Sequence, residues 1–250
     1  DYVAYVKSKC STENTLVIAS SKSGNTASTL EMLFLFDNYK TVAITTEGKG
    51  ALWEIVKKRS LDYLPVAKDI GGRFTGTSES AYFPLSLLGA NIEEIHKGAQ
   101  EFYNNPSPAL IVSRALYAAE QKGYTEVFAP VYSKLLFGFN GIITQLCHES
   151  FGKDNKGLTF LCSEAPESQH HTNQRLFGGR KNMVGLFIRV ANFKNKITMK
   201  CPDDLENIPF SNKTLNNFNL PYSTALHYEF EGTQKDAINS KIPNIVLTID

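Results

Sequence analysis

The sequence predicts an α/β protein built on mainly parallel, doubly wound sheets. Short apolar runs, many of them rich in β-branched residues, alternate along the chain with longer stretches of helical periodicity. Several of the short runs lack a polar alternation, as expected of strands that are covered on both faces. The 250 residues are 42% hydrophobic and 20% charged, which is typical of a globular chain with ample material for a core.

The elements follow from these runs in chain order. Strands are expected at residues 15–19, 41–45, 127–129, 158–162, 184–190 and 244–249, and helices at 26–36, 50–58, 91–104, 108–122, 134–149 and 222–240. The helical block from 92 to 122 interrupts the alternation, so we expect two α/β domains, residues 1–90 and 91–250, with helices joining them. Residues 200–221, rich in Asn, Pro and Asp, are expected to form a long loop.

Charge and cysteine content limit the classes of partner and compartment. The net charge of +1 does not suggest a nucleic-acid or acidic-membrane partner, and no apolar run approaches the ~20 residues of a membrane helix. The four cysteines (Cys10, Cys147, Cys162 and Cys201) are scattered without a CxxC pair. This pattern disfavours a zinc or redox motif and predicts a reduced, cytoplasmic setting.

The most informative stretch is the turn from Ser21 to Thr26. It follows the apolar run at 15–19 and precedes an apolar helical stretch, so it is expected to join a buried strand to a helix start. Backbone amides at a helix N-terminus attract anions, hydroxyl side chains add donors, and Gly24 lets the backbone approach a ligand. An ordinary helix cap is the simpler alternative, but four hydroxyl residues exceed what one cap needs. We therefore expect a phosphate site here.

A second cluster runs from Gly71 to Ser78. Two glycines precede Arg73, whose permanent charge and planar set of donors suit a phosphate or an oxyanion. Thr75, Thr77 and Ser78 place further hydroxyls ahead of an expected helix. Taken alone, this stretch is explained slightly better as a glycine-rich loop with a solvated Arg.

A third cluster closes the helix expected at 134–149. Gln145 and Glu149 are four residues apart, so they share one face of that helix. A Glu at the end of a mostly apolar helix is unusual and makes Glu149 a candidate general base, although a surface Glu is the simpler interpretation. Gly152 and Lys153 are typical of a helix end.

Two adjacent histidines, His170 and His171, form the fourth cluster. Consecutive residues cannot share a helix face, so a metal held by both is not expected. A single His acting as an acid or base is the better functional interpretation, and a polar loop is the alternative. His96, His148 and His227 are isolated and are expected to be structural or surface residues.

Taken in order, these clusters resemble the motifs of the phosphoglucose isomerase family, which is built from two sugar-isomerase (SIS) domains. Residues 21–26 with Thr29 resemble the family's phosphate loop, and residues 71–75 resemble its GGR segment. Gln145 with residues 149–153 resembles Q-x-x-x-E-S-x-G-K, and His170 with Gln174 resembles the H-S-x-x-Q segment. The resemblance covers almost the whole chain, and the order of the motifs is more specific than any one of them.

The resemblance implies interconversion of glucose 6-phosphate and fructose 6-phosphate through a cis-enediolate. It makes Glu149 the base, Arg73 the stabiliser of the enediolate and His170 the group that assists ring opening from the neighbouring subunit of a homodimer. The implied substrate-binding residues are Ser21, Lys22, Ser23, Asn25, Thr26, Thr29, Gly72 and Gln145. The resemblance requires no cofactor or metal, because the chemistry is proton transfer.

The chain also departs from the family pattern. Asn25 stands where Thr is usual and Ser28 where Glu is usual, which leaves substrate preference open. The family's first glycine-rich strand and its C-terminal catalytic Lys do not appear, so a chain truncated at both ends is expected. The alternatives are a dual phosphoglucose/phosphomannose isomerase and a non-catalytic SIS module that binds a phosphosugar.

Overall fold

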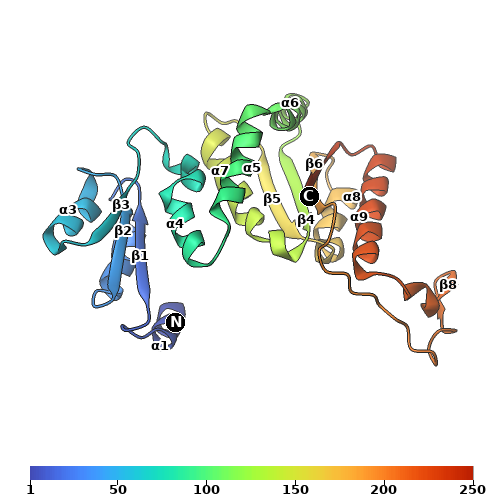
Figure 1. Cartoon of the computed structure of the whole chain (residues 1–250). Coiled ribbons are helices and arrows are strands. Elements are labelled where there is room, and N and C mark those ends of the chain that lie inside the picture. Colours follow the sequence, from blue (N-terminus) through green and yellow to red (C-terminus); the bar gives the residue numbers. More distant parts are fainter. Residues whose placement is uncertain (250) are drawn as a thin grey trace. The chain divides into compact units, whose positions relative to one another are not determined.

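The computed structural model describes residues 1–249 and consists of two compact units (Figure 1). Unit 1 is Asp1–Pro106, and unit 2 begins at Ser107. Helix α5 (Ile92–Asn104), which the sequence assigned to the second domain, is counted with unit 1 by its contacts. The domain boundary at residue 90 itself stays a prediction.

Unit 1 contains a parallel three-stranded sheet in the order β1-β2-β3, with β1 Leu16–Ser21, β2 Lys40–Thr45 and β3 Asp62–Pro65. The crossover helices are α2 (Ala27–Leu35) and α3 (Gly50–Arg59). Because right-handed crossovers that step in one direction place their helices on one face, α2 and α3 cover the same side. Leu33 of α2 and Leu52 of α3 pack there against Ala19 and Ala43.

The rest of unit 1 includes elements that the sequence did not predict. These are α1 (Tyr2–Lys9), β3, the 3-10 turn η1 (Gly72–Thr77) and the bounds of α4 (Glu79–Leu87). Strand β3 escaped prediction because Asp62 and Pro65 give its four residues no apolar run. It forms because it pairs in parallel with β2, with Val42 opposite Asp62 and Thr45 opposite Pro65.

Unit 2 contains a parallel four-stranded sheet in the order β5-β4-β6-β9. Its strands are β4 Glu126–Tyr132, β5 Thr159–Glu164, β6 Met183–Val190 and β9 Asn244–Ile249. The chain steps outward from β4 to β5, returns past β4 to β6, and continues to β9. This reversal places helices on both faces. The α/β class with parallel sheets is therefore confirmed.

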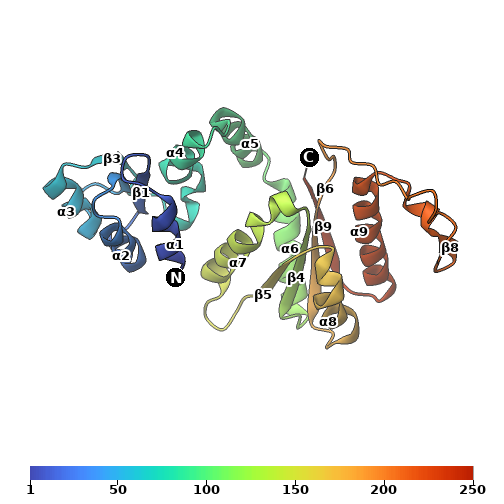
Figure 2. The same cartoon turned by 90° about the horizontal axis from the view of Figure 1, so that it is seen from below.

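Alternate residues of β4 mark the two faces of this sheet. Val127 and Ala129 pack with residues of α6 (Ser107–Gln121) and α7 (Gly138–Phe151). Phe128 and Tyr132 pack with α8 (Thr172–Gly178) and α9 (Tyr222–Asn239). Both views show α9 alongside β6 and β9 (Figures 1 and 2).

Between β6 and α9 lies a long excursion, as the composition of 200–221 predicts. It contains only the short pair β7 (Pro209–Phe210) and β8 (Lys213–Thr214) and the 3-10 turn η4 (Leu215–Phe218). A further 3-10 turn, η2 (Lys134–Leu136), precedes α7, and η3 (Glu167–His170) precedes α8. Among residues 1–249, no helix has the length and apolar character needed to cross a bilayer.

Candidate functional site

The hydroxyl-rich turn lies at the carboxyl edge of the sheet in unit 1, between β1 and α2. In parallel α/β sheets this edge is where ligands bind. Ser21, 5% exposed, ends β1 and its Oγ lies 2.8 Å from Oγ1 of Thr26. Gly24 takes a left-handed φ of +69° and donates its N–H to the carbonyl of Ser21 at 3.1 Å. Thr29 donates its hydroxyl to the carbonyl of Ser20 at 3.3 Å.

The N-terminus of α2 is open toward this turn. Thr26 is its N-cap residue but makes no side-chain cap hydrogen bond, and its carbonyl accepts from Leu30 at 3.1 Å. Within residues 1–249, the amides of Ala27, Ser28 and Thr29 donate to no protein acceptor. These donors and the helix dipole suit an anion, and the binding of an anion at this turn stays a prediction.

The turn is joined to the loop that follows β2. Asn25 Oδ1 accepts the N–H of Ala51 at 2.9 Å, and the carbonyl of Gly24 accepts the N–H of Leu52 at 2.9 Å. Gly24 and Gly50 pass so closely that a Cβ on Gly24 would lie 2.5 Å from the carbonyl oxygen of Lys49. No local pattern in the sequence indicates this contact, since its partners are more than 20 residues apart.

The remaining candidates of unit 1 lie in the chain that follows β3. Lys22 Nζ donates to the carbonyl of Lys68 at 3.0 Å, which ties the anion turn to the segment that leads to η1. Arg73, half-buried, is the second residue of η1, and Ser78 caps α4, as the hydroxyls there predict. A Cβ on Gly72 would meet nothing within 4 Å in the described structure, so local packing does not require glycine there.

A cavity of about 490 Å³ lies against the edge strand β1 in unit 1. Its walls come from α1, β1 and α2, and they include Ser20, Ser28 and Thr29. The cavity therefore borders the first turn of α2, where the open amides lie.

In unit 2, Gln145 and Glu149 lie on the last two turns of α7, as their spacing predicts. Gln145 Nε2 donates to Glu149 Oε1 at 3.3 Å. The neighbouring His148 accepts the N–H of Phe160 with its Nε2 at 2.9 Å. Because Phe160 is the second residue of β5, this end of α7 and Glu149 lie at the amino edge of the sheet.

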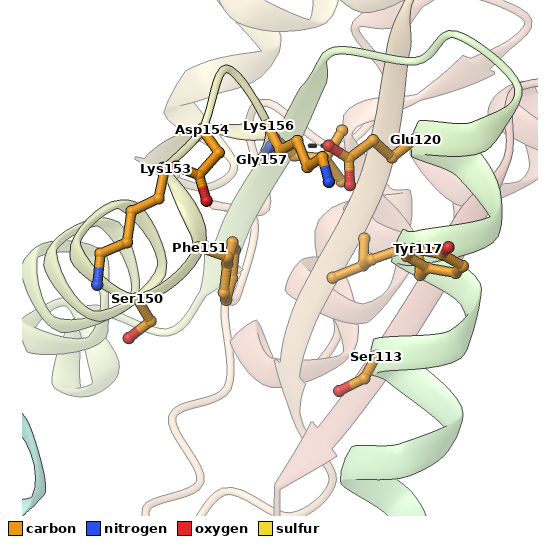
Figure 3. Close-up of a pocket in the computed structure, with 11 residues that line it drawn as sticks. Ser113, Tyr117, Glu120, Ser150, Phe151, Lys153, Asp154, Lys156 and Gly157 are labelled. Atoms are coloured by element: carbon orange, nitrogen blue, oxygen red, sulfur yellow. Dashed lines mark hydrogen bonds between the residues drawn. The ribbon is translucent and has the colours of Figure 1, made fainter.

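Next to this end of α7 is a cavity of about 520 Å³ between α6 and α7 (Figure 3). Tyr117 and Glu120 face it from α6, and Phe151 points into it from α7. Glu120 Oε1 accepts the N–H of Gly157 at 2.7 Å, which anchors the loop after α7. Ser150 also lines the cavity, whereas Glu149 is not among the lining residues.

His170 lies at the opposite, carboxyl edge of the same sheet. It is exposed and ends η3, which begins three residues after the last residue of β5, Glu164. The six residues of β5 span roughly 17 Å at ~3.3 Å per residue. The two edges of the sheet are separated by about that length, with Glu149 near one edge and His170 near the other.

Three residues near His170 were missed by the sequence analysis. Gln169 Nε2 donates to Thr233 Oγ1 at 3.1 Å and to the carbonyl of Glu229 at 3.2 Å, which ties η3 to α9. Tyr132, 2% exposed, lies in the same core, and burial raises the pKa of its hydroxyl. Only the tertiary contact with α9 identifies these residues, so no local motif could have found them.

Arg73 belongs to unit 1 and Glu149 to unit 2. Their convergence with each other and with His170 stays a prediction. Within each unit, the structure groups Ser21, Ser23, Asn25, Thr26 and Thr29 on one turn with Lys22, and Gln145 with Glu149 on one helix face.

The two parallel sheets with their crossover helices place the chain among α/β proteins of SIS-like fold. The fold matches a hypothetical protein from Thermus thermophilus with a TM-score of 0.86 and 21% identity, over 100% of this chain and 63% of that one. It matches a glucose-6-phosphate isomerase from Chlamydia trachomatis with a TM-score of 0.71 and 21% identity, over 99% and 52% of the two chains.

Sequence relatives define the family further. The chain is 28% identical over 95% of its length to a probable glucose-6-phosphate isomerase from Methanococcus maripaludis, and 28% identical over 83% to a glucose-6-phosphate isomerase from Acholeplasma laidlawii. The chain belongs to the glucose-6-phosphate isomerase family. It spans about half the length of these two relatives, 55% and 49%. No family model matches it.

Proposed function

We propose that the chain carries catalytic parts of an aldose-ketose isomerase that interconverts glucose 6-phosphate and fructose 6-phosphate. The observation that carries this proposal is the open N-terminus of α2 beside Ser21 and Thr26, in a chain related to glucose-6-phosphate isomerases. In this proposal the sugar phosphate binds at that turn through the amides of α2 and the hydroxyls of Ser21, Ser23, Thr26 and Thr29.

The chemical step is assigned to Glu149 and Arg73. The Glu149 carboxylate removes the proton from C2 of the open-chain sugar and returns it to C1. Arg73 stabilises the enediolate, because its fixed charge lies where the oxygen becomes negative. Gln145, which donates to Glu149 on the same helix face, orients the carboxylate and the substrate hydroxyls.

Ring opening is assigned to His170 of a second copy of the chain. Within one unit 2, His170 and Glu149 lie at opposite edges of the sheet. A homodimer in which His170 of each copy enters the site of its partner satisfies this geometry. It also agrees with the exposure of His170 in its own chain.

The test compares Glu149→Gln with Ser21→Ala. We expect Glu149→Gln to abolish turnover and leave the affinity for glucose 6-phosphate nearly intact, because only the base is lost. Ser21→Ala should chiefly weaken binding. Turnover is measured by coupled assay and affinity by calorimetry, with the exposed Glu231→Gln on α9 as a matched control.

The opposite pattern, in which Glu149→Gln weakens binding and Ser21→Ala abolishes turnover, would show that base and cradle are misassigned. Phosphosugar binding without turnover would instead identify a binding module. The same assay with mannose 6-phosphate decides between a dual and a single specificity.

A further inference from the structure

We propose that Asn25 is a positioning residue, which holds the phosphate turn in place by tying it to α3 and does not itself contact the phosphate. This inference rests on the proposed function and concerns the same cradle.

The first argument is the capping of α3. Its N-cap residue, Lys49, makes no side-chain cap hydrogen bond. Asn25 instead supplies the cap from another loop, because its Oδ1 accepts the N–H of Ala51 at 2.9 Å. The carbonyl of Gly24 takes the next amide, that of Leu52, also at 2.9 Å. Two of the amides that a helix start leaves unpaired are therefore bound by the phosphate turn.

The second argument is the fit of the two backbones. Gly24 is buried with a φ of +69°, and Gly50 has a φ of +79°. A Cβ on Gly50 would lie 2.3 Å from the carbonyl oxygen of Ser23, so only glycine permits this approach. The hydrogen bond between Asn25 and Ala51 thus ties the phosphate turn to the start of α3, where the two backbones are already in contact.

The third argument is the contrast between two helix starts at one sheet edge. The first turn of α3 donates to Asn25 and Gly24, whereas Ala27, Ser28 and Thr29 of α2 have no protein acceptor within residues 1–249. The backbone N–H of Asn25 donates to Ser23 Oγ at 3.2 Å. In this inference, the backbone amides at the start of α2 bind the anion. Asn25 contributes by keeping the phosphate turn in the conformation that leaves these amides accessible.

The experiment uses the full chain and glucose 6-phosphate, with affinity measured by calorimetry at a temperature where every variant is folded. Asn25→Ala should weaken binding about fivefold, since a lost cap allows the turn to open and only the closed fraction binds. Asn38→Ala, an exposed Asn beyond the far end of α2, is the matched control and should leave the affinity unchanged.

A second variant separates positioning from mere stability. Lys49→Ser gives α3 a cap of its own without a link to the turn. Added to Asn25→Ala, it should restore the melting temperature but not the affinity, when compared with Lys49→Ser alone. Restored affinity, or an Asn25→Ala variant that melts earlier yet binds like the original chain, would overturn the inference. If the original chain does not bind glucose 6-phosphate, the proposed function fails first.

Discussion

At the scale of single residues, the structure shows where glycine is required and where it is replaceable. Gly50 adopts a φ of +79° beside the carbonyl of Ser23, so both its backbone conformation and its surroundings exclude a side chain. Gly98 lies in the exposed helix α5 with nothing within 4 Å of an added Cβ. The two positions therefore respond to the same substitution in opposite directions.

We predict that Gly50→Ala lowers the free energy of unfolding by about 2 kcal/mol or more, through left-handed strain and the contact with Ser23. Gly98→Ala should raise it by about 0.5–1 kcal/mol, because Ala is the better helix former. Urea titration of both variants measures the difference. An unchanged midpoint for Gly50→Ala would contradict the close approach of the two loops.

The thiol of Cys147 is a second residue with a defined response. Burial on the side of α7 that packs against the sheet, with a smaller contribution from neighbouring Cys162, raises its pKa to about 11. We predict slow alkylation of Cys147 in the native chain at pH 8 and faster reaction as the pH approaches 11, because only the thiolate reacts. Mass spectrometry of the labelled peptides measures both rates. Native labelling as fast as in guanidinium would contradict the burial.

The raised pKa of Cys147 also makes the free energy of unfolding depend on pH. The unfolded thiol, with an ordinary pKa of 9.0, loses its proton first, so the unfolded state binds fewer protons between about pH 9 and 11. The contribution of Cys147 to stability is therefore complete below about pH 9 and declines as the pH rises through this range.

At the scale of elements, η3 is held in place by α9 rather than by its own sequence. Gln169 reaches Thr233, which is 6% exposed and donates its own hydroxyl to the carbonyl of Glu229 at 3.0 Å. This tie fixes the short turn that carries His170. It also explains why a polar Thr is buried in an otherwise apolar helix face.

We predict that Thr233→Val, which keeps the shape and removes the hydroxyl, lowers the free energy of unfolding by about 1–2 kcal/mol. The loss arises because Gln169 then lacks one of its two acceptors. Thr159→Val on the exposed face of β5 is the control, and Val should be tolerated there because it favours strands. Denaturant titration that finds equal stabilities would show that the tie is not formed.

Elements with strong local patterns were predicted from the sequence. The strand at 244–249 and the helix expected at 91–104 are confirmed, each within one residue. Strand β3 and the short helix α8 lack such patterns and depend on their neighbours, β2 and the core of unit 2. The anion turn was predictable because its residues are consecutive. The Asn25–Ala51 bond was not, because it joins two loops through tertiary structure.

At the scale of the whole molecule, the sheet of unit 2 separates two candidate catalytic groups. Glu149 lies where its strands begin, and His170 lies where they end. In the proposed homodimer, a site that uses both draws them from two copies of the chain.

We predict that two inactive variants, Glu149→Gln and His170→Ala, regain activity when they are unfolded together and refolded as a mixture. Half of the pairs are then mixed, and each mixed pair has one intact site, so about a quarter of the original activity should return. The turnover assay measures this. Each variant unfolded and refolded alone is the control and should stay inactive, and a mixture that stays inactive would contradict the shared site.

The separation of the two sheet edges has a consequence for how such an enzyme responds to dilution. In a lone subunit, Glu149 and His170 would lie at opposite edges of the sheet. That subunit could then not both open the ring of a cyclic sugar and transfer its proton. Catalysis would then be a property of the associated pair, and subunit dissociation alone could switch it off without any change inside either fold.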